Sequence, residues 1–266
     1  MPIITISRGT YTRGKEIAEK LAEKLGYECI SRDVLIEASS EFNIPEVKLV
    51  RALHDAPSVL SRFTYGKERY IAFIRKALLE AVKDGNVIYH GLAGQFLLKE
   101  VPHIFKVRIL ADIEARIKEE MKRENITEDK ARHLLKKDDD ERRKWSLALY
   151  GIDTTDAYLY DIVLHIDTLT VDDAVDILAN AADRPAFRPT PESKKIIDNL
   201  VLGAQVQALL VDKYPTVQAT NKEGVVYIGI NGSPSQQTKI AADVDKLLEG
   251  LEGIKEIKTT VVPIVT

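Results

Sequence analysis

The sequence has little cysteine, methionine and tryptophan, and it has no long hydrophobic run. Its single cysteine, Cys29, excludes an internal disulfide framework and a cysteine-based metal site. No apolar stretch approaches the roughly 20 residues of a transmembrane helix, so no membrane span is expected. The first residues lead directly into an apolar strand rather than a cleavable signal, and we therefore expect a cytoplasmic protein.

A strong excess of either charge is also missing. The formal net charge is −3, from 38 Lys and Arg against 41 Asp and Glu, so no specific nucleic-acid partner is expected. Hydrophobic residues make up 45% and charged residues 30%, a composition typical of folded globular proteins. A length of 266 residues allows one large α/β domain and a second, smaller one.

The N-terminal stretch ITISRGTYTRGKEIAEKLAEKL combines a strand pattern, a turn and a helix pattern. The apolar run Ile3–Ile6 suits a strand buried on both faces, and apolar residues from Ile17 to Leu25 recur at helical spacing. Between them, Gly9, Gly14 and Lys15 match the G-x-x-x-x-G-K part of a phosphate-binding loop. Backbone N–H groups of such a loop, together with the following helix N-terminus, favour anions.

This loop motif is incomplete, because Glu16 stands where such loops offer a Ser or Thr hydroxyl to Mg²⁺. A carboxylate there would be repelled by phosphate unless a metal or an arginine lay between. Arg8 and Arg13 flank the loop glycines and supply positive charge. The alternative is an ordinary strand-to-helix turn with a solvated lysine. The predicted phosphate-binding residues are Arg8, Gly9, Thr10, Tyr11, Thr12, Arg13, Gly14, Lys15 and Glu16.

Five short apolar segments, each followed by helix, predict an α/β fold: a doubly wound parallel sheet of about five strands. They are Ile3–Ile6, Glu28–Ser31, Asn86–Tyr89, Phe105–Leu110 and Asp161–Ile166. Helical or turn patterns in the same region cover Asp33–Phe42, Pro45–Leu53, Ala56–Gly66 (turn-rich), Lys67–Lys83 and Thr170–Ala182.

Nine consecutive charged residues run from Lys136 to Lys144. One interpretation is a solvated helix with i,i+4 ion pairs. The other is a lid that folds over a nucleotide, with arginines that neutralise a transferring phosphoryl group. The predicted position, on a helical hairpin between the last two strands, favours the lid. His90 and His165 receive no role, and Trp145 is expected in the core.

The segment Asp183–Pro191 contains three prolines in nine residues, a composition typical of a linker. We therefore predict a domain over residues 1–183, a linker over 184–191 and a second domain over 192–266. The second domain has the pattern of a small α+β fold of order α-β-β-α-β. Its predicted elements are Glu192–Lys213, Thr216–Thr220, Val225–Ile230, Ser233–Leu248 and Ile254–Val265.

Most of residues 1 to 182 resembles the cytidylate-kinase-like family of P-loop nucleoside monophosphate kinases. The likeness rests on ITISRGTYTRGKEIAEKLAEKLGYECISRDVLIEAS, NVIYHGLAGQFLL, VRILADIEARIKEEMKRENITEDKARHLLKKDDDERRKW and YDIVLHIDTLTVDDAVDIL. The resemblance implies transfer of the γ-phosphate from ATP, with Mg²⁺, to a pyrimidine nucleoside monophosphate. It also implies catalytic roles for Lys15, Arg116 and Arg142, and acceptor binding by Ser31, Asp139 and Arg142.

Four departures from the family pattern open a second hypothesis. Tyr11 and Arg13 replace glycines of the loop, while Ser31 and Leu92 replace charged acceptor-site residues. These changes make an altered acceptor plausible, or a nucleotide- or anion-binding regulator that no longer transfers phosphate.

The C-terminal stretch TVQATNKEGVVYIGINGSPSQQTKIAADVDKLLEGLEGIKEIKTTVVP resembles a BON domain, with Gly224, Gly232 and Gly253 at its turns. The resemblance implies a small ligand or a protein partner for this domain. The alternative is a generic dimerisation module, which would make the protein a homo-oligomer.

Overall fold

The computed structural model describes residues 2–9, 13–31, 65–91 and 93–263, which form two compact units. The first unit contains the described residues before position 60 together with Asp84–Pro189. The second contains α4 (Gly66–Val82) and everything described from Thr190 onward. The sequence analysis grouped α4 with the N-terminal domain, whereas α4 packs against α9 (Pro191–Leu210) of the second unit.

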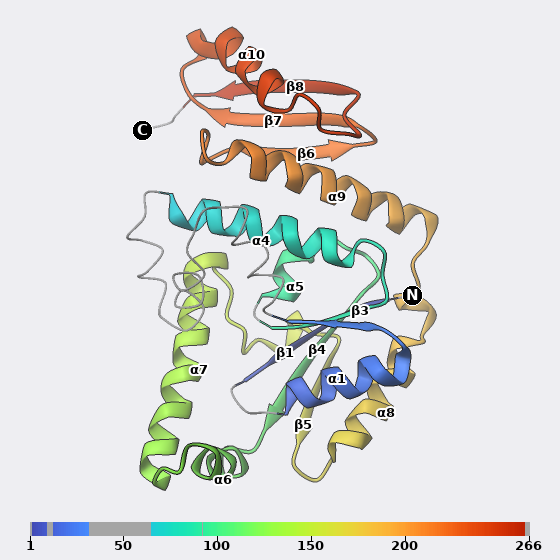
Figure 1. Ribbon diagram of the computed structural model, residues 1–266, viewed down its shortest axis with the longest axis vertical. Coiled ribbons are helices and arrows are strands. Elements are labelled where there is room, and N and C mark those ends of the chain that lie inside the picture. Colours follow the sequence, from blue (N-terminus) through green and yellow to red (C-terminus); the bar gives the residue numbers. More distant parts are fainter. Residues whose placement is uncertain (1, 10–12, 32–64, 92, 264–266) are drawn as a thin grey trace. The chain divides into compact units, whose positions relative to one another are not determined.

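The first unit is built on a five-stranded parallel sheet of order β2-β3-β1-β4-β5 (Figure 1). The predicted α/β fold with about five parallel strands is confirmed. Strand β1 lies in the middle and pairs on both edges, with Ile6 opposite His90 of β3 and Ser7 opposite Arg108 of β4. The strands are β1 (Ile3–Arg8), β2 (Glu28–Ile30), β3 (Val87–His90), β4 (Ile104–Ala111) and β5 (Ile162–Ile166).

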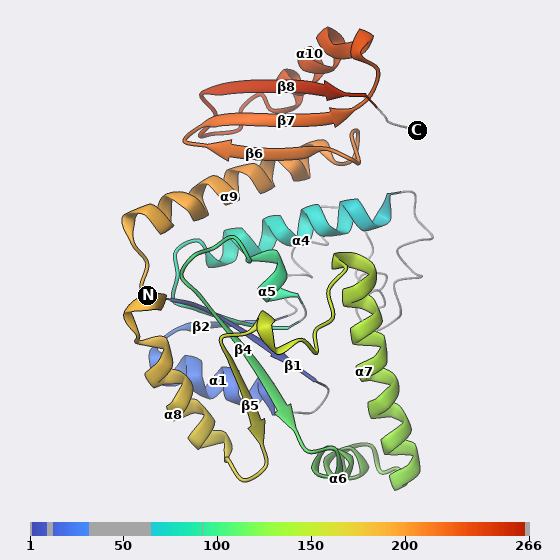
Figure 2. The same cartoon turned by 180° about the vertical axis from the view of Figure 1, so that it is seen from behind.

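Helices α1 (Gly14–Leu25) and α8 (Val171–Ala182) pack side by side, as both Figures 1 and 2 show. Alternate residues of the strands, such as Ile4 and Ile6, point into the apolar core with these helices. Helix α8 begins with a capping box in which Thr170 and Asp173 bond each other's backbone N–H groups.

A helical hairpin, hereafter the lid hairpin, connects β4 to β5 as predicted. It consists of α6 (Ile113–Glu124) and α7 (Glu128–Tyr150), and lies beyond the carboxyl end of β4 (Figure 2). Asp112 caps α6 by accepting from the N–H groups of Glu114 and Ala115. Arg132 of α7 forms a bidentate ion pair with Glu114 at 2.8 and 2.9 Å, and this pair joins the two helices. Trp145 is buried, as expected.

Three short helices of the first unit were not predicted: α5 (Gly94–Leu97) and the 3-10 helices Ala157–Leu159 and Pro185–Phe187. The segments predicted over Asp33–Phe42 and Pro45–Leu53, and the turn-rich stretch up to residue 64, lie outside the described residues. Within the part of the chain that the structure describes, no helix combines the length and hydropathy needed to span a bilayer.

The second unit has the expected α-β-β-α-β order. Its sheet has the order β6-β7-β8, with β6 and β7 antiparallel and β7 and β8 parallel. The side-chain amide of Gln237 donates to the carbonyl of Thr259 and accepts from the N–H of Val261, so it satisfies the outer edge of β8. Beyond α9, the elements are β6 (Gln218–Lys222), β7 (Val225–Asn231), the 3-10 helix Pro234–Gln236, α10 (Gln237–Leu247) and β8 (Glu256–Val262).

The proline-rich segment is anchored to the first unit rather than extended. Phe187 packs against the core of the sheet, with its ring centroid 4.5 Å from that of Phe105. Arg188 donates to the carbonyl and the carboxylate of Asp183, which tightens the turn after α8. The prolines therefore shape a turn here, and one aromatic side chain holds it in place.

Replacing Phe187 with alanine should lower the free energy of unfolding by about 2 kcal/mol, because the half-buried ring leaves a gap against Phe105. Denaturant unfolding would measure the change. The exposed Arg188→Ala is the control and should change stability by less than about 0.5 kcal/mol. Equal stabilities for the two variants would contradict the anchoring role of Phe187.

Candidate functional site

The expected phosphate loop, residues 8–15, joins β1 to α1, and Gly14 is its tightest point. A Cβ atom at Gly14 would lie 2.7 Å from Cβ and 2.8 Å from Cδ of Arg8, so only glycine fits beneath that side chain. Gly9 is half-buried beside Arg8. Thr10, Tyr11 and Thr12 lie outside the described residues.

Helix α1 starts without a side-chain cap. Its N-cap residue, Arg13, has a left-handed backbone with φ of 58° and makes no capping hydrogen bond. The first N–H groups of an α-helix have no partner within the helix, and the helix dipole makes that end attractive to anions. The start of α1 therefore has the local properties that phosphate binding requires.

Lys15 and Glu16 form ion pairs on the exposed surface of α1. The ammonium of Lys15 lies 3.6 Å from Glu19, and its side chain is 64% exposed. The carboxylate of Glu16 lies 3.6 Å from Lys20 and 4.0 Å from Arg13. The arginine that a carboxylate in this position would need beside phosphate is thus present.

Arg13 also connects the phosphate loop to the lid hairpin. Its Nε and Nη2 atoms lie 3.1 and 3.0 Å from Oε1 of Glu119 on α6. Glu119 was missed in the sequence analysis, because it lies 106 positions from Arg13 and belongs to no recognised motif. The contact shows that the loop and the hairpin meet at the edge of the sheet where β1 ends.

Two predicted residues of the lid hairpin come together. Arg116 is buried, and its Nη2 donates to Oδ2 of Asp139 at 2.8 Å, which links α6 to α7. Arg142 is half-buried one helical turn beyond Asp139. Ser31 is half-buried directly after β2, and Leu92 lies outside the described residues. The structure therefore pairs Arg116 with Asp139 within the hairpin, whereas Ser31 lies at the end of strand β2.

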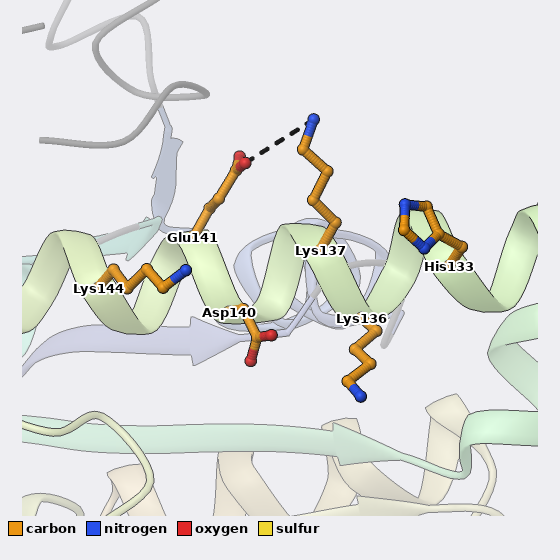
Figure 3. A pocket seen from close by; sticks show the side chains of 6 residues that line it. All are labelled: His133, Lys136, Lys137, Asp140, Glu141 and Lys144. Carbon is orange, nitrogen blue, oxygen red and sulfur yellow. Dashed lines mark ion pairs between the residues drawn. The ribbon is translucent and has the colours of Figure 1, made fainter. Parts of the chain in front are cut away.

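Several other charged residues of α7 line a hollow of about 300 Å³. Figure 3 shows Lys137 and Glu141 on one side of the helix, joined by an ion pair, and Lys136 and Asp140 on the opposite side. His133 and Lys144 complete the lining. The exposed i,i+4 pair of Lys137 and Glu141 fits the interpretation as a solvated helix, while Asp139 faces α6 and pairs with Arg116.

The segment that leaves α7 is held near its start by contacts of Asp153 and Thr154. Arg143 of α7 forms an ion pair with Asp153, with Nη2 2.7 Å from Oδ2. The hydrogen bond from Arg143 and those from the backbone and hydroxyl of Thr155 hold the pKa of Asp153 well below its usual range. The neighbouring carbonyl of Thr154 accepts a hydrogen bond from the guanidinium of Arg108 on β4.

A buried polar cluster around Tyr160 was not predicted from the sequence. The phenol oxygen lies 3.1 Å from Gln95 Nε2, 3.1 Å from Arg108 Nη1, 3.0 Å from the carbonyl of Thr154 and 3.3 Å from Ser7 Oγ. These residues come from α5, β4, the segment after α7, and β1. No sequence motif could have revealed the cluster, because Ser7 and Tyr160 are 153 positions apart.

Metal-ligating side chains do not gather in the described part of the first unit or elsewhere in the described residues: no group of three or more His, Cys, Asp or Glu could hold an ion.

Replacing Gly14 with alanine should destabilise the protein by about 2 kcal/mol, because the new methyl group overlaps Arg8. Thermal unfolding would show a lower midpoint than that of the parent protein. Gly229→Ala is the matched control, since a Cβ at Gly229 would meet nothing within 4 Å. Unchanged unfolding of Gly14→Ala would refute the close contact with Arg8.

Replacing Asp153 with asparagine should lower stability at neutral pH, and the deficit should shrink in acid. At pH values between the two pKa values, the carboxylate of Asp153 is ionised in the folded protein but protonated in the unfolded chain. Its contribution is therefore complete above the ordinary pKa of 3.8 and is lost as the pH falls through the lower folded-state pKa. Unfolding midpoints from pH 7 down to pH values below 3.8 would measure this, with exposed Asp167→Asn as the control. A deficit that grows in acid would contradict the ion pair.

Comparison with known proteins supports the geometry. The model of the cytidylate kinase-like family matches residues 3–168. The cytidylate kinase of Methanopyrus kandleri is 31% identical over 120 residues, which is 42% of this chain and 62% of that protein. The cytidylate kinase of Pyrococcus horikoshii is 30% identical over 105 residues, 40% of this chain and 54% of its own length. The chain thus spans just over half of the length of these relatives.

One solved structure supports the fold alone. An uncharacterized protein from Eubacterium ventriosum superposes with a TM-score of 0.51 and 24% sequence identity, over 69% of this chain and 99% of its own. The family model, by contrast, covers the phosphate loop, the lid hairpin and all five strands of the first unit. This protein therefore belongs to the cytidylate kinase-like family.

Proposed function

We propose that this protein is an ATP-dependent nucleoside monophosphate kinase that resembles cytidylate kinase and moves the γ-phosphate of ATP to a nucleoside monophosphate. One observation carries the proposal: Arg13 brings the uncapped start of α1 against the lid hairpin, whose α7 carries Asp139 and Arg142. A polyphosphate placed at the start of α1 would lie beside both elements.

The donor phosphates would bind at the phosphate loop. The uncapped N–H groups at the start of α1 and the ammonium of Lys15 supply the positive field. Lys15 pairs with Glu19 at the surface, and such an exposed pair contributes at most about 1 kcal/mol. A phosphate group with more than one negative charge would therefore draw the ammonium away from Glu19.

Lid residues would stabilise the migrating group. Arg142 would approach the transferring phosphoryl group when the hairpin closes, since catalysis of this reaction consists mostly of positioning and charge stabilisation. Arg116 is bound to Asp139, so it would orient that carboxylate toward the acceptor as well as add positive charge. Ser31, at the end of β2, would contact the acceptor from the sheet side.

ATP and Mg²⁺ fit these residues. When bound, Mg²⁺ would supply positive charge that offsets the negative charge of the phosphates. Phosphate oxygens would supply most of its ligands, and Glu16 offers a carboxylate where related loops offer a hydroxyl. Arg13, 4.0 Å from Glu16, would offset the repulsion between that carboxylate and the phosphates.

The proposal predicts that Lys15→Ala lowers the rate of transfer from ATP about 100-fold, because one charged phosphate ligand is lost. A coupled assay with ATP, Mg²⁺ and each common nucleoside monophosphate would measure it. Lys24→Ala is the matched control on the same helix, since Lys24 pairs with Asp176 far from the loop. Undiminished transfer by Lys15→Ala would remove the assignment.

A second candidate is a nucleotide- or anion-binding regulator that no longer transfers phosphate. The ion pairs favour it, because Glu119 and Glu19 already occupy the cations of the loop. In this case calorimetry would detect ATP binding while no monophosphate gave a product. Turnover with any monophosphate would eliminate it.

For residues 192–266 we propose a BON-like module that binds a small ligand or a protein partner. The α-β-β-α-β order supports this proposal, and self-association into a homo-oligomer is the alternative. The proposed nucleotide substrates are intracellular metabolites, which supports the cytoplasmic location expected from the sequence.

A further inference from the structure

Tyr160 lies where the phosphate loop and the exit of the lid hairpin come closest within the sheet. Ser7, one of its neighbours, directly precedes Arg8, the first residue of the loop. Thr154, another neighbour, belongs to the segment that leaves α7. The phenol therefore contacts the strand residue that leads into the loop and the segment that follows the lid hairpin.

The phenol of Tyr160 accepts hydrogen bonds from some of its neighbours and can donate one hydrogen bond to another. A phenol oxygen accepts at most two hydrogen bonds and donates one. Gln95 and Arg108 both donate to it, so its own hydrogen points to the carbonyl of Thr154 or to Ser7 Oγ. The carbonyl of Thr154 has two lone pairs and can accept from the phenol as well as from Arg108, so the phenol hydrogen can bond to Thr154 at 3.0 Å or to Ser7 Oγ at 3.3 Å.

Burial makes this arrangement expensive to break. Tyr160, Ser7 and Gln95 are exposed by only 8%, 8% and 5%. The Gln95 amide oxygen has no hydrogen-bond partner among the described residues, so the orientation of this amide depends on its bond to Tyr160. A buried donor left without its partner is strongly unfavourable, so removing the hydroxyl would shift its neighbours.

We propose that Tyr160 is a positioning residue for ATP, which holds the end of β1 and the exit of the lid hairpin in fixed relation. This inference rests on the proposed function. On the hairpin side, Arg143 and Asp153 fasten the same segment one residue earlier. Tyr160 itself touches no phosphate in this mechanism; it acts through Ser7 on the loop and through Thr154 on the hairpin.

Tyr160→Phe keeps the ring and removes only the hydroxyl. We expect it to weaken ATP binding about five- to tenfold by calorimetry at a temperature well below unfolding. Tyr158→Phe is the matched control, because Tyr158 lies in the same segment and is 99% exposed. It should bind ATP like the parent protein. Equal ATP affinity for Tyr160→Phe and the parent would overturn the inference.

The double variant separates positioning from general destabilisation. Ser7→Ala should weaken ATP binding by itself, and adding it to Tyr160→Phe should have little further effect, because both changes break the same connection. Additive losses in affinity would overturn the route through Ser7. If Tyr160→Phe does not fold, Ser7→Ala alone decides: an affinity equal to that of the parent rejects the inference.

Separate measurements of ATP binding and of phosphate transfer distinguish the proposed role of Tyr160 from the proposed kinase activity. Parent protein that binds ATP but yields no product with any monophosphate would refute the kinase proposal, and the Tyr160→Phe affinity would still decide the role of Tyr160. Active parent protein with unchanged ATP affinity in Tyr160→Phe would refute only the role of Tyr160. No ATP binding by the parent would refute both.

Discussion

Strand β1 is the constraint on which the first unit depends. It pairs with β3 on one edge and β4 on the other, and its residues Ile3, Ile4 and Ile6 are almost completely buried. A central strand with both edges bonded has one register, so the position at which it ends is defined to within a residue. The phosphate loop begins at that end, and its neighbours Arg108 and His90 are set by the same pairing.

In the protein without ligand, the cations around the loop form ion pairs with carboxylates of the protein itself. The cations around the loop are neutralised by nearby carboxylates: Arg13 by Glu119, Lys15 by Glu19, and Lys20 by Glu16 and Asp172. All of these pairs are substantially exposed, so each is weak and easily exchanged. The cations around the loop are therefore held in weak ion pairs that can exchange partners.

The two helices of the lid hairpin are joined by ion pairs. Arg132 pairs with Glu114, and the buried Arg116 pairs with Asp139. The hairpin also contacts the loop through Glu119 with Arg13, and the end of α7 packs into the unit through buried Trp145 and through Tyr150, whose ring centroid lies 5.6 Å from that of Phe96 on α5. The hairpin is therefore tied both to the loop and to the core of the first unit.

Local patterns in the sequence determined the five strands, the lid hairpin and the α-β-β-α-β order of the second unit, because each follows from periodicity and caps within about a dozen residues. The glycine at position 14 and the helix cap at Thr170 likewise follow from the local sequence. Tertiary structure alone decided the pairing of Arg13 with Glu119, the packing of Phe187 on Phe105, and the cluster around Tyr160. These contacts join side chains up to 153 positions apart, and only the closing of the sheet brings such residues within hydrogen-bonding distance.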